Sequence, residues 1–207
     1  MSRQTKQIGN EQAACRPLAA VASALAQRSL SIGIETMELL HLSSWDSEKR
    51  LRVVIETPKG SACKVRYDEG TRAFTFQRPL PDHRVYPYDW GFIPGTLAED
   101  GDPLDALVIH DAPTWPGVVI PSTPIALLRV SERKSPGESE RQNNRVIAVP
   151  DGHLNSPAVL SEATKRLIGE FLLAVGRQIK LVELRGWGDG NEARAEITRA
   201  SGRFRDK

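Results

Sequence analysis

The sequence predicts a mainly β fold with flanking helices, in the α+β class. Between residues 51 and 149, short apolar segments follow one another with Pro- and Gly-rich turns between them and without helical periodicity. From residue 160 onward, apolar residues recur at helical spacing instead. Short strands without intervening helices are typical of an antiparallel sheet or a closed barrel, on which the C-terminal amphipathic helices would pack.

The composition is that of a globular protein with one domain and an appendage. The chain has 207 residues, of which 40% are hydrophobic and 26% are charged. Its net charge of +2 is too small to indicate binding to nucleic acid or to a membrane surface. The two cysteines, Cys15 and Cys63, form no disulfide framework and lack a metal-ligand spacing, so we expect a reducing, cytoplasmic compartment.

Residues 1–45 are predicted as an N-terminal extension that is partly helical, and residues 46–207 as the main domain. Pro17 suits a first helical position, and the residues after it place an apolar face on one side, formed by Leu18, Val21, Ala22 and Leu25. A targeting segment is the alternative, because Arg16 precedes a run of small apolar residues. That run is too short to span a membrane.

The strands of the main domain begin at residue 52. A strand over 52–56 is followed by a hairpin over 64–77, in which polar residues alternate with apolar ones around Asp68-Glu69-Gly70. Further strands are expected at 106–109, 118–120, 125–130 and 146–149. The segment 132–144 has no large apolar residue and is predicted as a mobile loop.

The C-terminal part is predicted to hold two helices with one strand between them. The first helix covers 160–175, with Leu167 on its apolar face, and ends at Gly176. A strand is expected at 178–184. Asn191 would cap the last helix, whose inward face carries Ala193, Ile197 and Ala200.

An acidic stretch directly precedes the strand at 106–109. Four carboxylates fall within seven residues there: Glu99, Asp100, Asp102 and Asp105. Two carboxylates about 5 Å apart repel by roughly 3 kcal/mol at an effective dielectric of 20, so converging ones indicate a cation between them. Mg²⁺ suits such oxygen ligands and leaves positions for water and phosphate. The alternative is an acidic turn that faces solvent.

Four segments in a fixed order resemble the soluble inorganic pyrophosphatases of family I, of which this chain would be a divergent member. They are VVIETPKG at 53–60, YPYDWGFIP at 86–94, DGDPLD at 100–105 and VIAVP at 146–150. The resemblance covers about residues 51–201. It implies a five-stranded, OB-like closed barrel with flanking helices, a homo-oligomer, and hydrolysis of pyrophosphate to two orthophosphates with several Mg²⁺ ions.

The resemblance also implies roles for individual residues. Asp100 and Asp105 would ligate metal, with Glu56 on the metal side, and Asp102 would orient or deprotonate the attacking water. The phosphate-binding residues of the family fall at Lys64, Arg78, Tyr86 and Arg145. Without the motif, Lys64 and Arg78 would be solvent-facing hairpin residues and Tyr86 a packing residue.

The sequence departs from the family at several of these positions. A glutamate of the family is replaced by Arg66, and a phosphate-contacting tyrosine falls at Trp90, whose indole donates a hydrogen bond but accepts none. Two further metal-binding aspartates align with Glu132 and Asn143, which we predict as metal ligands; Glu138 or Glu140 could substitute for them. The first C-terminal helix lacks the family's Tyr-Lys pair, with Arg177 and Lys180 nearby.

Three functions from different classes follow from these patterns. The first is Mg²⁺-dependent hydrolysis of pyrophosphate, favoured by the three aspartates. The second is a catalytically impaired, pyrophosphatase-like binding or regulatory subunit, favoured by Arg66, Asn143 and the missing Tyr-Lys pair. The third is a metal-dependent hydrolase of another phosphoanhydride or phosphate ester, in which Trp90 would stack on a base.

Overall fold

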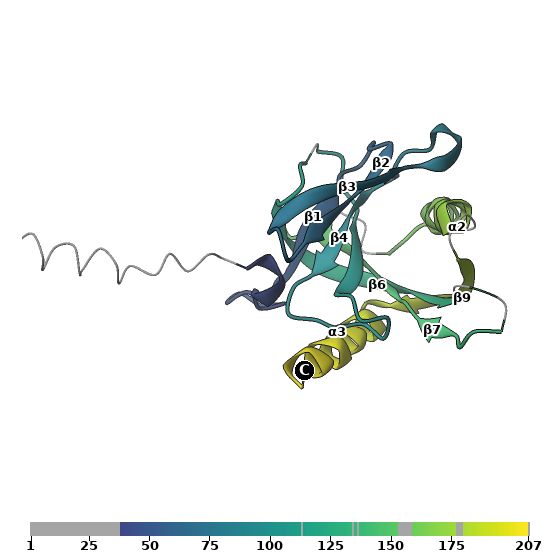
Figure 1. Ribbon diagram of the computed structural model, residues 1–207. Helices are drawn as coiled ribbons and strands as arrows, with labels where there is room; N and C mark the ends of the chain where they lie inside the picture. The colour runs from purple at the N-terminus through teal and green to yellow at the C-terminus, as the bar shows by residue number, and fades with distance from the viewer. Residues whose placement is uncertain are drawn as a thin grey trace, which may run out of the picture. The chain divides into compact units, whose positions relative to one another are not determined.

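The computed structural model describes residues 38–112, 114–133, 135, 137–152, 159–176 and 180–206 (Figure 1). In this part of the chain, eight strands precede the first α-helix. The strands are β1 (Leu51–Thr57), β2 (Cys63–Asp68), β3 (Ala73–Pro79), β4 (Asp89–Ile93), β5 (Leu104–Val108), β6 (Val119–Arg133), β7 (Arg141–Gln142) and β8 (Arg145–Pro150). The α-helix α2 (Glu162–Gly176), strand β9 (Leu181–Asp189) and helix α3 (Gly190–Arg205) follow. The mainly β class with flanking helices is confirmed.

Five strands are paired in a ring. The order is β1, β4, β5, β8 and β6, and β6 pairs again with β1 between residues 119–122 and 51–54. All these pairs are antiparallel except β5 with β8, which is parallel, so the purely antiparallel alternative was wrong on this point. Strands β7 and β9 extend the sheet from β6. The OB-like closed barrel stays a prediction.

Strand β6 joins two segments that were predicted as separate strands. It runs through Pro121 and Pro124, whose missing backbone donors suggested turns. The strand accommodates them because its pairing changes along its length, from β1 at residues 119–122 to β8 and β9 further on, with a register shift after Pro124. The predicted loop 132–144 also contains strand residues, since β6 reaches Arg133 and β7 covers 141–142.

Strand β4 is missing from the predicted strands. All five of its residues are buried, so its sequence shows no alternation between polar and apolar residues. Gly91 in its middle also weakened the strand signal. The glycine is needed there, because a Cβ at this position would lie 1.9 Å from the carbonyl oxygen of Val54 on β1.

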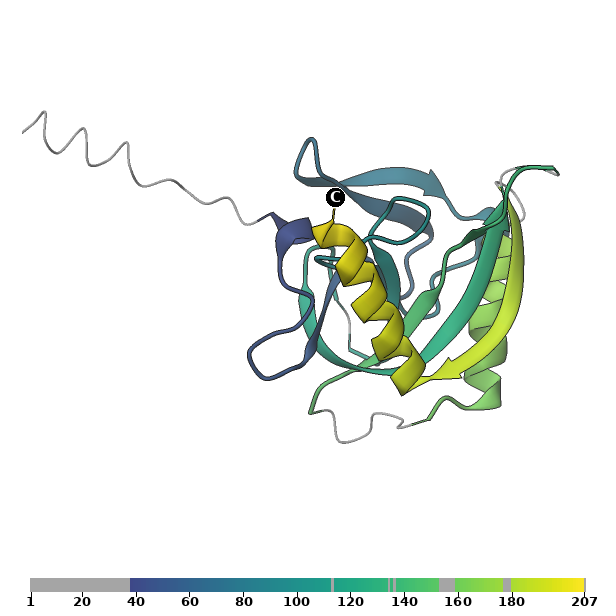
Figure 2. The same cartoon turned by 90° about the horizontal axis from the view of Figure 1, so that it is seen from below.

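Helices α2 and α3 pack on two different groups of core residues, and Figures 1 and 2 show them on different sides of the strands. The inward residues predicted for α3 are confirmed, since Ala193, Ile197 and Ala200 are fully buried. Its cap is Asp189 rather than Asn191, because the Asp189 carboxylate accepts from the N–H groups of Asn191 and Glu192. The prediction for Leu167 was wrong, as its side chain is 47% exposed.

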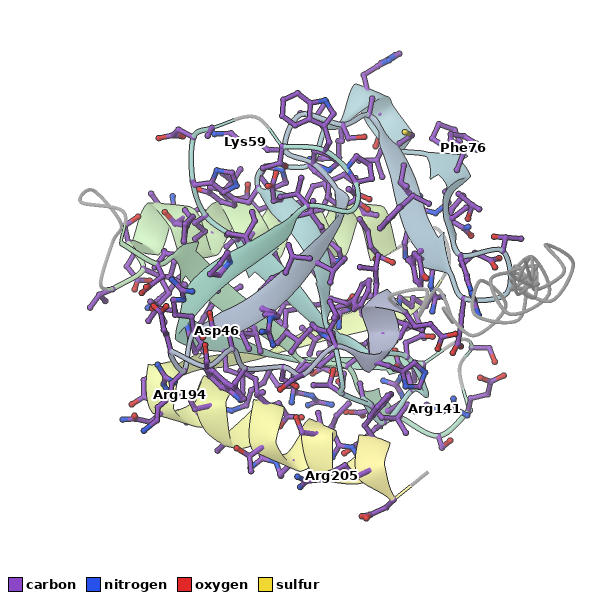
Figure 3. The ribbon with its side chains drawn as sticks, turned by 90° about the vertical axis from the view of Figure 1, so that its left-hand side faces the viewer. Asp46, Lys59, Phe76, Arg141, Arg194 and Arg205 are labelled. Atoms are coloured by element: carbon purple, nitrogen blue, oxygen red, sulfur yellow. The ribbon has the colours of Figure 1, made fainter. Side chains whose placement is uncertain are left out.

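The hairpin of β2 and β3 is confirmed, and part of it faces solvent. Phe76 on β3 is 65% exposed and lies at the outer edge of the hairpin in Figure 3.

Helix α3 also contacts the segment before β1, because the guanidinium of Arg194 lies 5.1 Å from the ring centroid of Trp45. No helix of the described residues is long and apolar enough to cross a membrane.

The first described residues contact the strands. A short 3-10 helix covers Leu39–His41, Ser44 donates its hydroxyl to the carbonyl oxygen of Pro94 at 2.7 Å, and Trp45 forms a bridge with Leu51. The division of the chain at residue 45 stays a prediction. The helix expected from Pro17 lies outside the described residues, as do Cys15 and Arg177.

Candidate active site

A pocket of about 890 Å³ collects most of the predicted site residues. It is lined by residues of β1 to β5 and β8, by the turn before β5, and at its edge by the 3-10 helix at Leu39–His41 and by Phe204 of α3. Eight of the eleven predicted residues take part in its lining: Glu56, Lys64, Trp90, Asp100, Asp102, Asp105, Asn143 and Arg145. Arg66 and Lys180 line it as well, although neither was among the eleven.

The acidic turn places three aspartates on this pocket. Gly101 has a φ of +93°, a left-handed conformation that glycine adopts readily. The backbone N–H of Asp102 donates to the Asp100 carboxylate at 3.1 Å, which tightens the turn. Asp105 lies on β5, opposite Phe92 of β4. The local sequence therefore places Asp100, Asp102 and Asp105 on the lining of the same pocket.

Two carboxyl groups of the pocket have raised pKa values. Burial raises the pKa of Glu56 to about 7, although a hydrogen bond of 2.7 Å from the backbone N–H of Tyr67 acts in the opposite direction. Burial also raises the pKa of Asp100, and the negative charges of Asp105 and Asp102 add to this effect. A cation beside these groups would favour their ionised forms.

Two of the aspartates face arginines. Asp102 forms an ion pair with Arg66 of β2. Asp105 forms an ion pair with Arg145 at 3.0 Å and accepts a hydrogen bond from the indole nitrogen of Trp90 at 3.3 Å. Within the described ranges, no three His, Cys, Asp or Glu side chains gather closely enough to share a metal ion.

Glu132 lies next to Arg145, behind the pocket lining. Its carboxylate accepts from Arg145 at 3.2 Å, from the side-chain amide of Asn143 at 3.0 Å, and from Lys180. Burial alone would raise the pKa of Glu132, but the neighbouring Arg145 and Lys180 outweigh it and lower the pKa. The predicted residues Glu132, Asn143 and Arg145 thus lie together in one cluster with Lys180.

The remaining basic and aromatic candidates lie in different surroundings. Lys64 is inside the pocket, where burial lowers the pKa of its ammonium group. Arg78 lies opposite Lys64 in the hairpin but is not among the lining residues. Tyr86 is buried, with its ring centroid 5.0 Å from that of Phe171 on α2 and 5.9 Å from that of Trp90. Tyr86 therefore attaches α2 to the sheet, and the substrate-binding roles of Tyr86 and Arg78 stay predictions.

Comparisons with known proteins agree with the family resemblance of the four segments between residues 53 and 150. The model of the inorganic pyrophosphatase family matches residues 53–205. An inorganic pyrophosphatase of Methanosarcina acetivorans is 38% identical over 162 residues, which cover 75% of this chain and 92% of that protein. An inorganic pyrophosphatase of Thermus thermophilus is 33% identical over 184 residues, covering 86% of this chain and 97% of that protein.

Comparison of the fold with solved structures indicates the same family as comparison of the sequence. The crystal structure of the inorganic pyrophosphatase from Thermus thermophilus superposes with a TM-score of 0.72 at 33% identity, covering 81% of this chain and 99% of that one. A structure from Coxiella burnetii, also an inorganic pyrophosphatase, superposes with a TM-score of 0.69 at 27% identity and covers 79% of this chain and 99% of that one. Since the family model spans most of the chain, and relatives above 30% identity align over nearly their whole length, this chain belongs to the inorganic pyrophosphatase family.

Proposed function

We propose that this chain hydrolyses inorganic pyrophosphate to two orthophosphates with Mg²⁺ as its metal. The single observation that carries the proposal is the convergence of Asp100, Asp102 and Asp105 on one pocket that also holds Lys64 and Arg145. Carboxylates supply the oxygen ligands that Mg²⁺ prefers, and basic side chains bind phosphate oxygens. Family membership indicates pyrophosphate as the substrate, because the relatives are named inorganic pyrophosphatases.

The carboxylates have different tasks in this proposal. Asp100 and Asp105 would hold Mg²⁺, with Glu56 on the same side, and Asp102 would take the proton of the attacking water. Bound there, Mg²⁺ would lower the pKa of water and neutralise charge on the leaving phosphate. The chemistry of the donors suits the ion, since Glu56 and the three aspartates line the same pocket and offer the carboxylate oxygens that Mg²⁺ prefers.

The basic side chains would bind the phosphates of the substrate. Lys64 and Arg145 are the best placed, because both line the pocket next to Asp105. Trp90 donates its indole N–H to Asp105, so it would orient this carboxylate as well as border the substrate. Arg78 and Tyr86 would contribute from the edge of the site, as the family resemblance suggests.

The compartment, the oligomeric state and the closure of the barrel are also proposals. We infer a cytoplasmic enzyme that forms a homo-oligomer and whose five paired strands form an OB-like closed barrel. The ring of strand pairs supports the barrel, and the small net charge supports the expectation that neither nucleic acid nor a membrane is a partner. The N-terminal extension would precede the catalytic domain in the sequence, since the family model begins at residue 53.

One specific observation favours the second function, a catalytically impaired binding subunit. Arg66 pairs with Asp102 and so competes with water for the carboxylate that should accept the proton. The third function, with a nucleotide as substrate, has less support. Trp90 is only 8% exposed, and Arg145 lies over its ring at 5.4 Å, which leaves little of the ring for a base.

The release of orthophosphate from three substrates separates these functions. Pyrophosphate, tripolyphosphate and ATP should be compared at equal concentration, with Mg²⁺ present. We expect pyrophosphate to be hydrolysed at least about 10²-fold faster than ATP, because a site that binds two phosphates has no contacts for a base. Faster hydrolysis of ATP would support the nucleotide hydrolase, and no hydrolysis of any substrate would support the impaired subunit.

A further inference from the structure

The carboxylate of Glu132 is already satisfied by other groups of the chain. One oxygen accepts from the Arg145 guanidinium at 3.2 Å, and the other accepts from the Asn143 amide at 3.0 Å and from the Lys180 ammonium. The side chains of Glu132 and Arg145 are only 10% and 4% exposed. Glu132 is therefore neutralised inside the protein without a metal ion.

The orientation of the Asn143 side chain is a further argument against a metal ion beside Glu132. An asparagine that ligates a metal presents its carbonyl oxygen to the ion. In this cluster the amide nitrogen of Asn143 donates to Glu132, and its carbonyl oxygen accepts from the guanidinium of Arg145. The oxygen atoms of Glu132 and Asn143 thus face cationic or donor groups of the chain, and this pair does not fit a divalent ion.

Charge adds a second argument against a metal at this place. A divalent cation bound to Glu132 would lie beside the guanidinium of Arg145 and the ammonium of Lys180, and both would repel it. The two basic groups also pair directly with the Glu132 carboxylate, so its charge is stabilised without any ion. By contrast, no basic side chain pairs with Asp100 among the described residues, and Asp102 and Asp105 each have a single arginine partner, Arg66 and Arg145.

We infer that Arg145 and Lys180 take the place of a divalent ion on the Glu132 side of the pocket. The inference rests on the proposed pyrophosphatase function. Metal ions are then held on the side of Asp100, Asp102 and Asp105, and the chain binds fewer of them than it would with free carboxylates at both 132 and 143. Since Arg145 and Lys180 also line the pocket, they bind a phosphate of the substrate directly. Lys180 therefore serves as a phosphate ligand that does not come from helix α2.

Binding of Mn²⁺ without substrate tests this division of the site. Equilibrium dialysis of Mn²⁺ should be compared for wild type, Glu132→Gln and Asp105→Asn. We expect Glu132→Gln to keep the number of bound ions and their affinity within about twofold, and Asp105→Asn to lose at least about tenfold in affinity. Glu162→Gln is the matched control, because Glu162 is exposed and pairs with Lys165 on helix α2, and it does not line the pocket.

The outcomes separate this inference from the proposed function. A tenfold loss of Mn²⁺ affinity in Glu132→Gln would overturn the inference while leaving the pyrophosphatase proposal intact. An unchanged affinity in Asp105→Asn would instead contradict the metal side of the proposed function. Neither outcome depends on turnover, since no substrate is present.

A second measurement uses the wild-type chain and does not require a variant to fold. Crystals soaked in Mn²⁺ give anomalous scattering peaks at the bound ions. We expect the Mn²⁺ peaks to lie beside Asp100, Asp102 and Asp105, and Lys180 to remain paired with Glu132. A peak that coordinates the Glu132 carboxylate would overturn it.

Discussion

The guanidinium of Arg66 on β2 pairs with the carboxylate of Asp102 in the turn before β5, although 36 residues separate them along the chain. Both side chains are partly exposed, at 41% and 50%. Both residues line the pocket, so Asp102 has to leave Arg66 before it acts on water. Arg66 thus competes with the water for this carboxylate, and its positive charge also acts on the proposed metal-side residues Glu56 and Asp105.

Replacing Arg66 by Gln should lower the concentration of Mg²⁺ that gives half-maximal activity. Exposed ion pairs contribute up to about 1 kcal/mol, which corresponds to a change of about fivefold. The measurement is pyrophosphate hydrolysis titrated with Mg²⁺. Arg72→Gln is the control, because Arg72 lies in the turn of the same hairpin and pairs with Glu38 outside the pocket. An unchanged Mg²⁺ requirement in Arg66→Gln would show that the pair does not compete with metal.

Lys180→Gln should raise the Michaelis constant for pyrophosphate more than it lowers turnover. Lys180 lines the pocket and carries a charge that neutralises Glu132, and the loss of one charge-assisted hydrogen bond costs roughly 1.5 to 3 kcal/mol, or about 10- to 150-fold in binding. Lys165→Gln is the matched control, because Lys165 pairs with Glu162 on helix α2. A normal Michaelis constant in Lys180→Gln would remove Lys180 from the phosphate site.

The raised pKa of Glu56 predicts a pH dependence of stability in metal-free buffer. The folded chain holds the proton with a pKa of about 7, against an ordinary value of 4.5, so it binds more protons than the unfolded chain between these values. The free energy of unfolding should therefore fall as pH rises from 4.5 to 7, by up to about 3 kcal/mol. Urea denaturation at several pH values, with EDTA, measures it.

Glu56→Gln should remove this part of the pH dependence, because glutamine does not titrate. The difference in unfolding free energy between wild type and Glu56→Gln is the quantity to plot, since other groups titrate equally in both. A difference that stays constant from pH 4.5 to 8 would mean that Glu56 has an ordinary pKa.

Asp89 holds two loops onto β4, the strand that carries Trp90. Its fully buried carboxylate accepts from the backbone N–H of Lys59 at 2.7 Å, from Thr114 at 2.6 Å and from His110 at 2.7 Å. Asp89→Ala should reduce the free energy of unfolding by about 3 to 5 kcal/mol, because it leaves buried donors without partners. Urea denaturation checks this, with Asp111→Ala as the control.

Asp111 lies in one of the same loops, but its carboxylate is fully exposed and pairs only with the Lys59 ammonium. No measurable change is expected in Asp111→Ala. Equal stability of the Asp89 and Asp111 variants would show that the three hydrogen bonds of Asp89 contribute little.

Local patterns were enough to predict much of the fold and the turn that carries Asp100 and Asp102. The β2–β3 hairpin has an alternating sequence on both sides of a short turn, and the turn from Asp100 to Asp105 is set by neighbouring residues and by Gly101. Strand β4 is buried on both faces, so it shows no such alternation. Capping is local as well, but Asp189 and Asn191 are both good capping residues two positions apart, and the sequence does not choose between them.

The basic half of the site depends on contacts between distant parts of the chain. Lys180 meets Glu132 across 48 residues, because β9 pairs with β6 in a register that places Leu181 opposite Arg133. A register of this kind is set by packing of the whole sheet, since a shift by one residue would turn every side chain to the other face. Sequence patterns therefore identified Glu132 as a candidate without revealing which groups surround it.

The most direct test of the proposed function compares orthophosphate release from pyrophosphate by wild type and by Asp102→Asn. Asparagine keeps the size of the side chain but does not accept the proton of the attacking water. We predict that wild type releases orthophosphate with Mg²⁺ and stops with EDTA, and that Asp102→Asn is slower by roughly 10²- to 10⁴-fold. Equal turnover of the two proteins, or wild-type turnover that persists in EDTA, would contradict hydrolysis by Asp102 and Mg²⁺.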